Sequence, residues 1–336
     1  MMKMRRPFVT KQLELNSKTL LAQIELQQSD FYKTSSELLK IKFEWDSLDQ
    51  IKNADHLENG VHSLKYNEYL FESLLLAKQN AEKLYVLFSG ARKTNSNNEI
   101  TDTLPRFKRW SFHPIFDGHV LIIDDPMYYK YSNLVAGWFF GTSNSDLISL
   151  CLDVIHCFST KLKIPNDHII FYGSSAGGYA AIAAAARSPN TLAVAINPQL
   201  RPHLFKHGAS FHSITGIDLA EKDSYGRNDL ITVILEATRS QFFIIQNAQA
   251  SHDIKNHFLP LCKRINLSLN YGLSHKNNLL TWLYSSKGGH TAYENKQLLW
   301  FILSIASNFK AQKKLLNIDT EMIVLISELW GSLYNK

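Results

Sequence analysis

Six short runs along the chain are continuously apolar, and segments with a helical spacing of apolar residues separate most of them. Uninterrupted apolar runs of this length are typical of strands buried on both faces of a parallel sheet. The runs lie at 84–88, 119–123, 168–172, 191–196, 242–245 and 279–284. The intervening helices are predicted at 146–162, 177–187, 254–264 and 294–310. This alternation predicts an α/β fold, with a mainly parallel central sheet flanked by helices.

The two ends of the chain follow other patterns. Apolar and polar residues alternate near the start, which predicts two strands at 18–28 and 36–45, each with one solvated face. We therefore interpret residues 1–60 as a small N-terminal β-rich appendage outside the main sheet, and residues 61–310 as the main α/β domain. Apolar residues at helical spacing predict a final amphipathic helix over 311–336.

Composition and charge narrow the class of protein. The 336 residues are 45% hydrophobic and 20% charged, which fits a globular domain with a sizeable core. A net charge of +6 favours an anionic partner, or it reflects a basic solvated surface with no specific role. Lys and Arg form no run with interleaved aromatic residues, so we expect no nucleic-acid partner.

Cysteine usage and the N-terminus bear on the compartment. Cys151, Cys157 and Cys262 are odd in number and form no C-x-x-C pair, so we interpret them as buried thiols in a reducing compartment and expect no metal site. The basic N-terminus lacks the apolar stretch of a secretory signal. No apolar run approaches about 18 residues, the length of a transmembrane helix. We expect a cytoplasmic protein, and peripheral membrane association stays open.

The segment Gly173-Ser174-Ser175-Ala176-Gly177 carries the strongest chemical signal, because it fits G-x-S-x-G between an apolar run and a helical segment. Small neighbours allow the tight turn that exposes a nucleophilic serine, here Ser175. The backbone N–H of Ala176 would then face the reaction centre as an oxyanion donor. Ser174 is interpreted as a local hydrogen-bonding residue. The alternative is a glycine-rich turn with a capping serine. In this context the segment resembles the nucleophile elbow of the α/β-hydrolase superfamily.

A nucleophilic serine of this fold needs an acid and a histidine later in the chain, in that order. His290 follows Gly288-Gly289 after the last apolar run, and Asp253 is the only carboxylate in the loop after the run at 242–245. The alternatives are an ordinary surface-loop histidine and an aspartate that caps the helix at 254–264. The N–H of Ala91, in the loop after 84–88, is our second oxyanion donor; the alternative there is a plain glycine turn.

A closer resemblance rests on the residues around the elbow and on four further segments. The sequence is similar to bacterial surface-glycan enzymes of this fold, which include capsule-polysaccharide O-acetyltransferases and glycan O-acetyltransferases of accessory secretion systems. The segments are 171–181, Phe88-Ser89-Gly90-Ala91, Arg109-Trp110-Ser111, Gly137-Trp138 and Asn197-Pro198-Gln199. One departure is that such relatives often carry the acid about three residues after the Gln-Asn pair, which here is Ala250.

The resemblance implies an O-acetyltransferase that modifies a bacterial surface polysaccharide or glycan through an acyl-serine intermediate. It implies acetyl-CoA as the acyl donor, no permanently bound cofactor, and a carbohydrate or small acyl-ester substrate that can be anionic. A carboxylesterase or deacetylase with the same triad is the first alternative. A catalytically silent binding component of a glycan-assembly or secretion complex is the second, and a peptidase is a weaker third.

Overall fold

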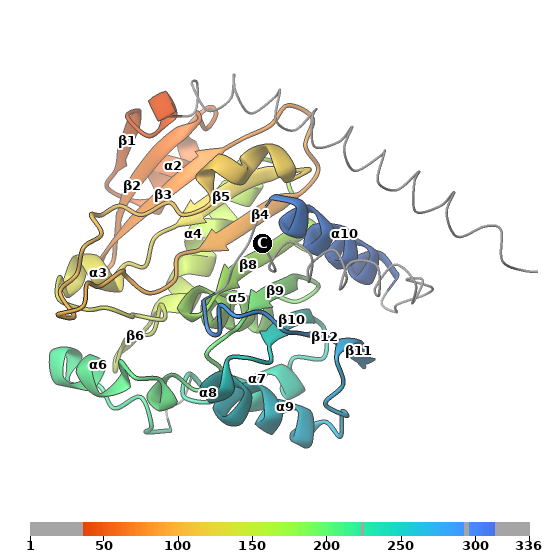
Figure 1. Cartoon of the computed structure of the whole chain (residues 1–336). Coiled ribbons are helices and arrows are strands. Elements are labelled where there is room, and N and C mark those ends of the chain that lie inside the picture. Colours follow the sequence, from red (N-terminus) through yellow and green to blue (C-terminus); the bar gives the residue numbers. More distant parts are fainter. Residues whose placement is uncertain (1–35, 223–224, 292–295, 313–336) are drawn as a thin grey trace, which may run out of the picture.

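A ten-stranded sheet forms the centre of the molecule, in the order β1-β2-β3-β5-β4-β8-β9-β10-β12-β11 (Figure 1). The structure is a computed structural model that describes residues 36–222, 225–291 and 296–312. The six strands from β5 to β12 in this order are mutually parallel. β3 is antiparallel to both of its neighbours, and β11 is antiparallel to β12. The predicted α/β class with a mainly parallel sheet is confirmed.

The elements have the following bounds. The strands are β1 (Lys42–Trp45), β2 (Gly60–Tyr66), β3 (Tyr69–Leu76), β4 (Leu84–Phe88), β5 (His119–Ile123), β6 (Gly141–Thr142), β7 (Ser145–Asp146), β8 (Ile169–Ser174), β9 (Leu192–Ile196), β10 (Gln241–Asn247), β11 (Gly272–Lys276) and β12 (Leu279–Tyr284). The longer helices are α2 (Leu48–Asn53), α4 (Leu147–Lys161), α5 (Ala176–Arg187), α6 (Gly208–Thr215), α7 (Leu230–Glu236), α9 (Leu259–Arg264) and α10 (Lys296–Gln312). The shorter ones are α3 (Met127–Lys130), α8 (Ser251–Asp253), the 3₁₀ turns η1 (Trp110–Ile115), η2 (Asn166–His168) and η3 (Pro202–Leu204), and the π-helical turn η4 (Ile254–Phe258).

The six apolar runs form the six parallel strands, and the four helices predicted between 146 and 310 are found, the third as the π-helical turn η4 followed by α9. Strands β4, β5, β9 and β12 are buried along their whole length, as the uninterrupted apolar pattern predicts. Strands β2, β3 and β11 are additional to the prediction. In β2 and β3, buried polar residues interrupt the apolar pattern, and they pair with one another: Ser63 Oγ donates to Glu72 Oε1 at 2.6 Å.

The N-terminal segment differs from its prediction where the structure describes it. The strand expected at 36–45 is confined to β1, and β1 pairs in parallel with β2 at the edge of the main sheet. Its placement outside that sheet is therefore wrong for residues 42–45. Alternate side chains of β1 are exposed, as expected of an edge strand. The strand predicted at 18–28 and the tail from 313 to 336 lie outside the described residues, and the domain boundary at residue 60 stays a prediction.

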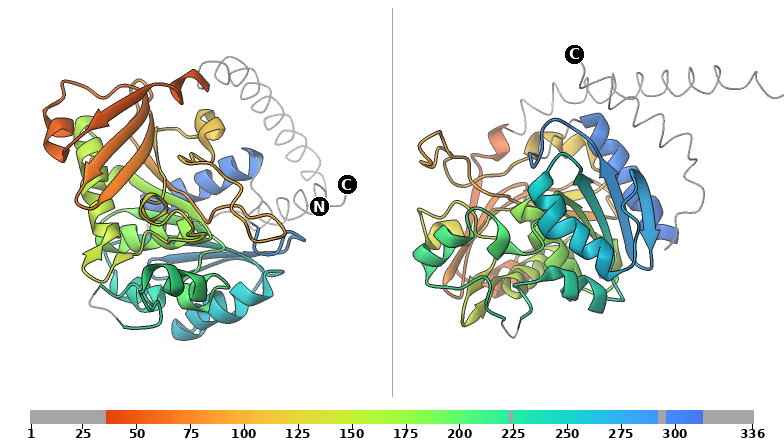
Figure 2. Two further views of the ribbon diagram at one scale, coloured as in Figure 1. Left: turned by 90° about the vertical axis from the view of Figure 1, so that its left-hand side faces the viewer. Right: turned by 60° about the horizontal axis from the view of Figure 1, so that its bottom comes forward.

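Helices cover both faces of the sheet, and each face has its own apolar core (Figure 2). Val86 of β4 points into the core formed with α4, α5, α7 and α9, whereas its neighbours Tyr85 and Leu87 point into the core formed with α10 and η1. Cys151, Cys157 and Cys262 are buried free thiols, as predicted. Within the described ranges, no helix is both long enough and apolar enough to cross a membrane.

The turn from β8 into α5 is packed against the end of β4 with no room for a side chain. A Cβ atom added to Gly177 would lie 2.3 Å from the carbonyl oxygen of Phe88. One added to Gly173 would lie 2.2 Å from the carbonyl oxygen of Gly177. Both contacts are with backbone, which cannot rotate aside. Glycine at these two positions therefore fixes how closely α5 approaches the sheet.

We expect Gly177→Ala to lower the free energy of unfolding by about 3 kcal/mol, because the new methyl group forces α5 away from β4. Gly178→Ala is the matched control, since its Cβ would lie 3.2 Å from the Pro198 side chain and needs only a small adjustment. Urea unfolding of the two variants beside the wild type measures the difference. Equal stability of both variants would contradict the close approach described here.

Candidate active site

Ser175 lies on a strained turn at the carboxyl edge of the sheet. β8 ends at Ser174 and α5 begins at Ala176, so only Ser175 separates strand from helix. Its backbone has φ 56° and ψ −121°, a conformation that costs about 1–3 kcal/mol for a residue with a side chain. Its N–H donates to the carbonyl of Ile196 at 2.9 Å, which ties the turn to β9. The strained backbone of Ser175 and its hydrogen bond to Ile196 together place the Ser175 hydroxyl above the sheet.

Ser175, His290 and Asp253 form one hydrogen-bonded chain. Ser175 Oγ lies 2.8 Å from His290 Nε2, and His290 Nδ1 lies 2.5 Å from Asp253 Oδ2. The Asp253 side chain is 2% exposed and that of His290 is 33% exposed. Asp253 makes no side-chain capping bond, so the alternative of a helix cap does not describe it. The structure thus brings the three predicted residues together; their catalytic roles remain a prediction.

This arrangement has a clear chemical capacity. A carboxylate at Nδ1 holds a proton on that nitrogen, which leaves Nε2 free to accept the proton of the serine hydroxyl. Because Asp253 is buried, its negative charge acts through little water and would stabilise an imidazolium at His290. A serine paired in this way with an oriented base is activated as a nucleophile.

Buried amides position the loop that carries His290. Asn247, at the end of β10, donates from Nδ2 to the carbonyls of Ser286 and Gly289, and its Oδ1 accepts from the N–H of Ser286. Asn197, after β9, donates to the carbonyl of His290 at 3.2 Å and accepts from the N–H of Asn247 at 2.8 Å. Both asparagines are fully buried. Removing either side chain would leave buried backbone groups without partners.

Asn197 and the Asn of the Gln246-Asn247 pair belong to the segments quoted from the sequence, but no role was predicted for either. The signal was available in part, because Asn197 directly follows one apolar run and Asn247 lies two residues after another, at the carboxyl edge of the parallel strands. The contacts between these polar groups and the 285–290 loop depend on the order of the strands in the sheet. The sequence alone did not supply that order.

The two predicted oxyanion donors lie on segments that flank the turn. The N–H groups of Ala176 and Ala91 have no hydrogen-bond acceptor within the part of the chain that the structure describes. The loop of Ala91 is fixed from behind by the buried Arg106, which donates to the carbonyls of Gly90 and Ala91 at 2.6 and 3.0 Å. A Cβ on Gly90 would lie 3.2 Å from the carbonyl oxygen of Ser174, so this loop runs directly beside the elbow.

Two more polar side chains border the reactive group. The Arg109 guanidinium donates to Ser174 Oγ at 2.8 Å, so Ser174 is a hydrogen-bonding residue as predicted, but its partner is distant in the sequence rather than local. The fully buried Gln199 places its amide nitrogen 3.5 Å from His290 Nε2, and its Oε1 accepts from the indole N–H of Trp138 at 2.5 Å. Sequence analysis did not assign a role to Arg109, Gln199 or Trp138.

A cavity of about 720 Å³ opens beside this edge, and Lys93, Lys108 and Arg109 line it. Burial, together with the nearby positive charges of Arg106 and Arg109, lowers the pKa of Lys108 to about 8. Arg106 and Asp102 also line the cavity, and they pair with each other at 3.0 Å. The three other basic side chains leave the lining with an excess of positive charge, which suits an anionic group.

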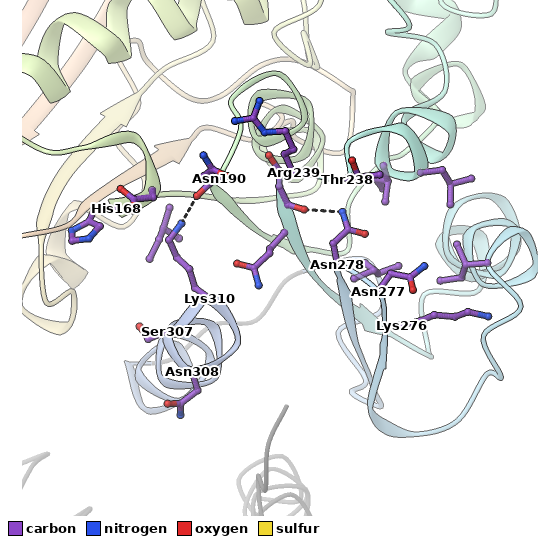
Figure 3. Close-up of a pocket in the computed structure, with 18 of the residues that line it drawn as sticks. His168, Asn190, Thr238, Arg239, Lys276, Asn277, Asn278, Ser307, Asn308 and Lys310 are labelled. Carbon is purple, nitrogen blue, oxygen red and sulfur yellow. Dashed lines mark hydrogen bonds between the residues drawn. The ribbon is translucent and has the colours of Figure 1, made fainter. Parts of the chain in front are cut away.

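A second cavity, of about 1090 Å³, lies away from this site (Figure 3). It is lined by residues at the amino ends of the parallel strands, such as Ile170, Gln241 and Leu279, and by Lys310 of α10. Ser175 follows the carboxyl end of β8, so the cavity and the candidate site are on opposite edges of the sheet. In open parallel sheets ligands bind at the carboxyl edge. The position of Ser175, and not that of this cavity, fits this rule.

Asp253→Asn should keep the fold but favour the wrong tautomer of His290, which slows the reaction of Ser175 with a fluorophosphonate probe by about 10⁴-fold. Asp218→Asn, at an exposed carboxylate outside the hydrogen-bonded chain, serves as the control and should label at the wild-type rate. Gel fluorescence measures the labelling rates of the wild type and both variants. A loss below tenfold would mean that another group orients His290.

Comparison with known proteins gives structural matches only. No family model and no curated protein matches the sequence. Among solved structures, the chain is similar to the glycosylation-associated Gap123 complex of Streptococcus agalactiae (16% identity, TM-score 0.52) and to an acylaminoacyl peptidase of Pyrococcus horikoshii (12% identity, TM-score 0.52).

These two matches cover 73% and 82% of this chain but only 45% of each of the other chains. A capsule O-acetyltransferase of Neisseria meningitidis serogroup A matches over 79% of this chain and all of its own, with 15% identity and a TM-score of 0.48. The two matches with a TM-score of 0.52, together with the strand–turn–helix elbow, show that the chain has the α/β-hydrolase fold.

Proposed function

We propose that this chain is a serine acyl-ester enzyme that transfers an acetyl group to a hydroxyl of a bacterial surface polysaccharide or glycan. The observation that carries the proposal is the hydrogen-bonded chain Ser175–His290–Asp253 at the carboxyl edge of the sheet. In this proposal Ser175 is the nucleophile, His290 the general base and acid, and Asp253 the group that orients His290. The N–H groups of Ala176 and Ala91 would bind the oxyanion.

The first half of the reaction acylates the serine. As Ser175 Oγ attacks the thioester carbonyl of acetyl-CoA, its proton passes to His290 Nε2 and a new C–O bond forms. The carbonyl oxygen becomes an oxyanion between the two backbone donors. When the C–S bond breaks, the departing thiolate takes the proton from His290. Acetyl-Ser175 and free CoA remain.

The second half transfers the acetyl group. A sugar hydroxyl gives its proton to His290 and attacks the carbonyl of acetyl-Ser175. The C–O bond to Ser175 then breaks, and Oγ regains the proton from His290. The products are the acetylated sugar and free Ser175. With water in place of the sugar, the same steps release acetate.

Three observations support the choice of substrates. The motif resemblance in the sequence is to glycan O-acetyltransferases. One structural neighbour is a glycosylation-associated complex, which favours a glycan-related partner. The basic cavity beside the elbow suits an anionic molecule, and both acetyl-CoA, with its phosphates, and an acidic glycan are of that kind.

An esterase or deacetylase is the second candidate function, and the partial exposure of His290 favours it. One third of the His290 side chain is accessible, so water can approach the acyl-serine unless a bound sugar excludes it. A silent binding component has less support, because the complete hydrogen-bonded chain provides what an activated serine needs.

The decisive experiment incubates the full-length protein with acetyl-CoA and a panel of purified neutral and acidic polysaccharides. New O-acetyl signals in the proton NMR spectrum of the polysaccharide would support transfer. Release of acetate at the same rate with and without every polysaccharide would favour the esterase. Neither product, together with no labelling of Ser175 by a fluorophosphonate, would overturn both enzymatic candidates.

Ser175→Ala should reduce acetyl transfer by about 10⁴-fold or more and abolish probe labelling, while the melting temperature stays close to that of the wild type. The substitution removes one oxygen from a partly exposed turn rather than from a packed core. Ser174→Ala is the matched control, and it should keep most of the activity. The opposite pattern would show that the nucleophile has been assigned to the wrong serine.

The charge of Lys108 should appear in the pH dependence of KM for acetyl-CoA. With a pKa of about 8, Lys108 is cationic at pH 7 and mostly neutral at pH 9, so an anionic donor binds less well at the higher pH. We expect KM to rise about fivefold between pH 7 and pH 9, because the loss of one ion pair weakens binding by about 1 kcal/mol.

Two variants control this prediction. Lys108→Met should show a high KM that hardly changes with pH, and Lys108→Arg a low one that hardly changes. An unchanged pH slope in Lys108→Met would contradict the role of this side chain.

A further inference from the structure

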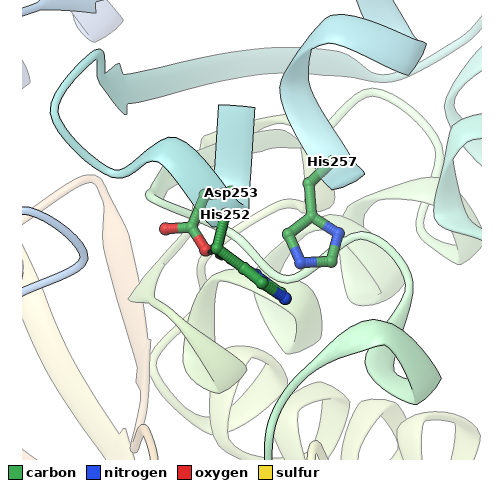
Figure 4. A group of neighbouring side chains, drawn as sticks. All are labelled: His252, Asp253 and His257. Atoms are coloured by element: carbon green, nitrogen blue, oxygen red, sulfur yellow. Dashed lines mark ion pairs between the residues drawn. The ribbon is translucent and has the colours of Figure 1, made fainter. Parts of the chain in front are cut away.

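Three potential metal ligands lie together, and one of them is the aspartate of the hydrogen-bonded chain. α8 ends at Asp253, and the π-helical turn η4 follows directly, with the N–H of Leu259 bonded to the carbonyl of Ile254 five residues earlier. Such turns are rare and frequently occur at functional sites. Here the local fold brings one ligand atom from each of His252, Asp253 and His257 within 4.8 Å of the others (Figure 4).

The buried histidine of this cluster lacks hydrogen-bond partners among the described residues. His257 is 0% exposed, and neither of its ring nitrogens has a hydrogen-bond partner among the described residues. An unsatisfied buried polar group costs about 1–3 kcal/mol, so such a group in a native fold points to a missing partner. Figure 4 shows the His257 ring turned toward His252. A cation between these side chains would supply the partner.

The donor set fits a particular class of ion. Two imidazoles and one carboxylate are typical ligands of Zn²⁺, and three protein ligands leave a fourth position for water. Tetrahedral coordination requires ligand atoms about 3.3 Å apart, given metal–nitrogen distances near 2.0 Å. The approach of the ligand atoms to this spacing falls to His252, whose side chain is 51% exposed, whereas Asp253 and His257 are buried. The exposed histidine also gives the ion a route from solvent.

The cluster shares its carboxylate with the triad. Asp253 Oδ2 lies 2.5 Å from His290 Nδ1, and the other oxygen, Oδ1, lies 3.8 Å from His252 Nδ1. We propose that His252, Asp253 and His257 bind one Zn²⁺ ion through Oδ1 of the aspartate, and that the bound ion inhibits the reaction of Ser175. The ion withdraws negative charge from the carboxylate, which then stabilises the imidazolium of His290 less well.

Metal binding itself does not depend on the proposed function, whereas the inhibition rests on it. The first measurement is therefore calorimetric titration of the EDTA-treated, full-length protein with ZnCl₂, supported by the visible absorption spectrum of the Co²⁺ form. We expect one tetrahedral site per chain, and His252→Ala should weaken binding by at least about tenfold. His257→Gln should weaken it further.

His212→Ala, at an exposed histidine on α6, is the control and should bind as the wild type does. Because His252 is half-exposed, its removal leaves the fold intact even where substitution of the buried His257 does not. Equal affinity and stoichiometry in His252→Ala and the control would place the ion elsewhere and overturn the site.

The second measurement is the rate at which a fluorophosphonate labels Ser175, with and without Zn²⁺. Labelling of the wild type should slow as the ion binds, and labelling of His252→Ala should be unaffected at the same concentration. If Zn²⁺ binds at the cluster without slowing the wild type, the coupling to the triad is overturned. A wild type that never labels would count against the proposed function alone, because calorimetry tests the site independently.

Discussion

The close backbone contact between the elbow and the end of β4 is the constraint on which the site depends. Gly177 lies against the carbonyl of Phe88, and Gly173 lies against the carbonyl of Gly177, so α5 starts as near to the sheet as a helix can. This proximity leaves Ser175 as the only residue between strand and helix and forces its backbone to a positive φ. The same contact sets the loop of Ala91 beside the elbow. One steric condition thus places both the hydroxyl and the backbone donors around it.

A second layer of structure holds the histidine. His290 comes from a loop with little regular structure, and the amides of Asn197 and Asn247 replace the backbone hydrogen bonds that such a loop lacks. Asn197 directly follows β9 and Asn247 is the last residue of β10, so their hydrogen bonds attach the loop to two rigid strands. Precise placement of a base otherwise requires a helix or a strand. The candidate site therefore combines a strained turn with a loop fixed by buried polar groups.

The sequence predicted much of this arrangement, and the exceptions have physical causes. The six parallel strands were predictable because burial on both faces leaves an unbroken apolar run. Chain order and loop position predicted one set of three interacting residues, Ser175, Asp253 and His290. The structure places them within hydrogen-bonding distance of one another.

Strands β2 and β3 were missed because Ser63 and Glu72 satisfy each other inside them, which hides the apolar pattern. The edge position of β1 was missed because alternation does not reveal which strand it joins. The amide network and the His252–His257 cluster depend on contacts across elements, and local patterns do not encode these.

The π-helical turn has a consequence for how this region varies between related chains. Such a turn differs from an α-helix by the insertion of a single residue, and each residue of an α-helix advances the chain by about 100°. Deleting one position within 254–256 would restore the α-helical phase and leave Asp253, in the segment that follows β10, beside His290. The residue now at 257 would rotate to another side of the helix. A single deletion would therefore break up the cluster of His252, Asp253 and His257 while Asp253 still contacts His290. The hydrolase fold and its triad geometry would then not depend on the π turn.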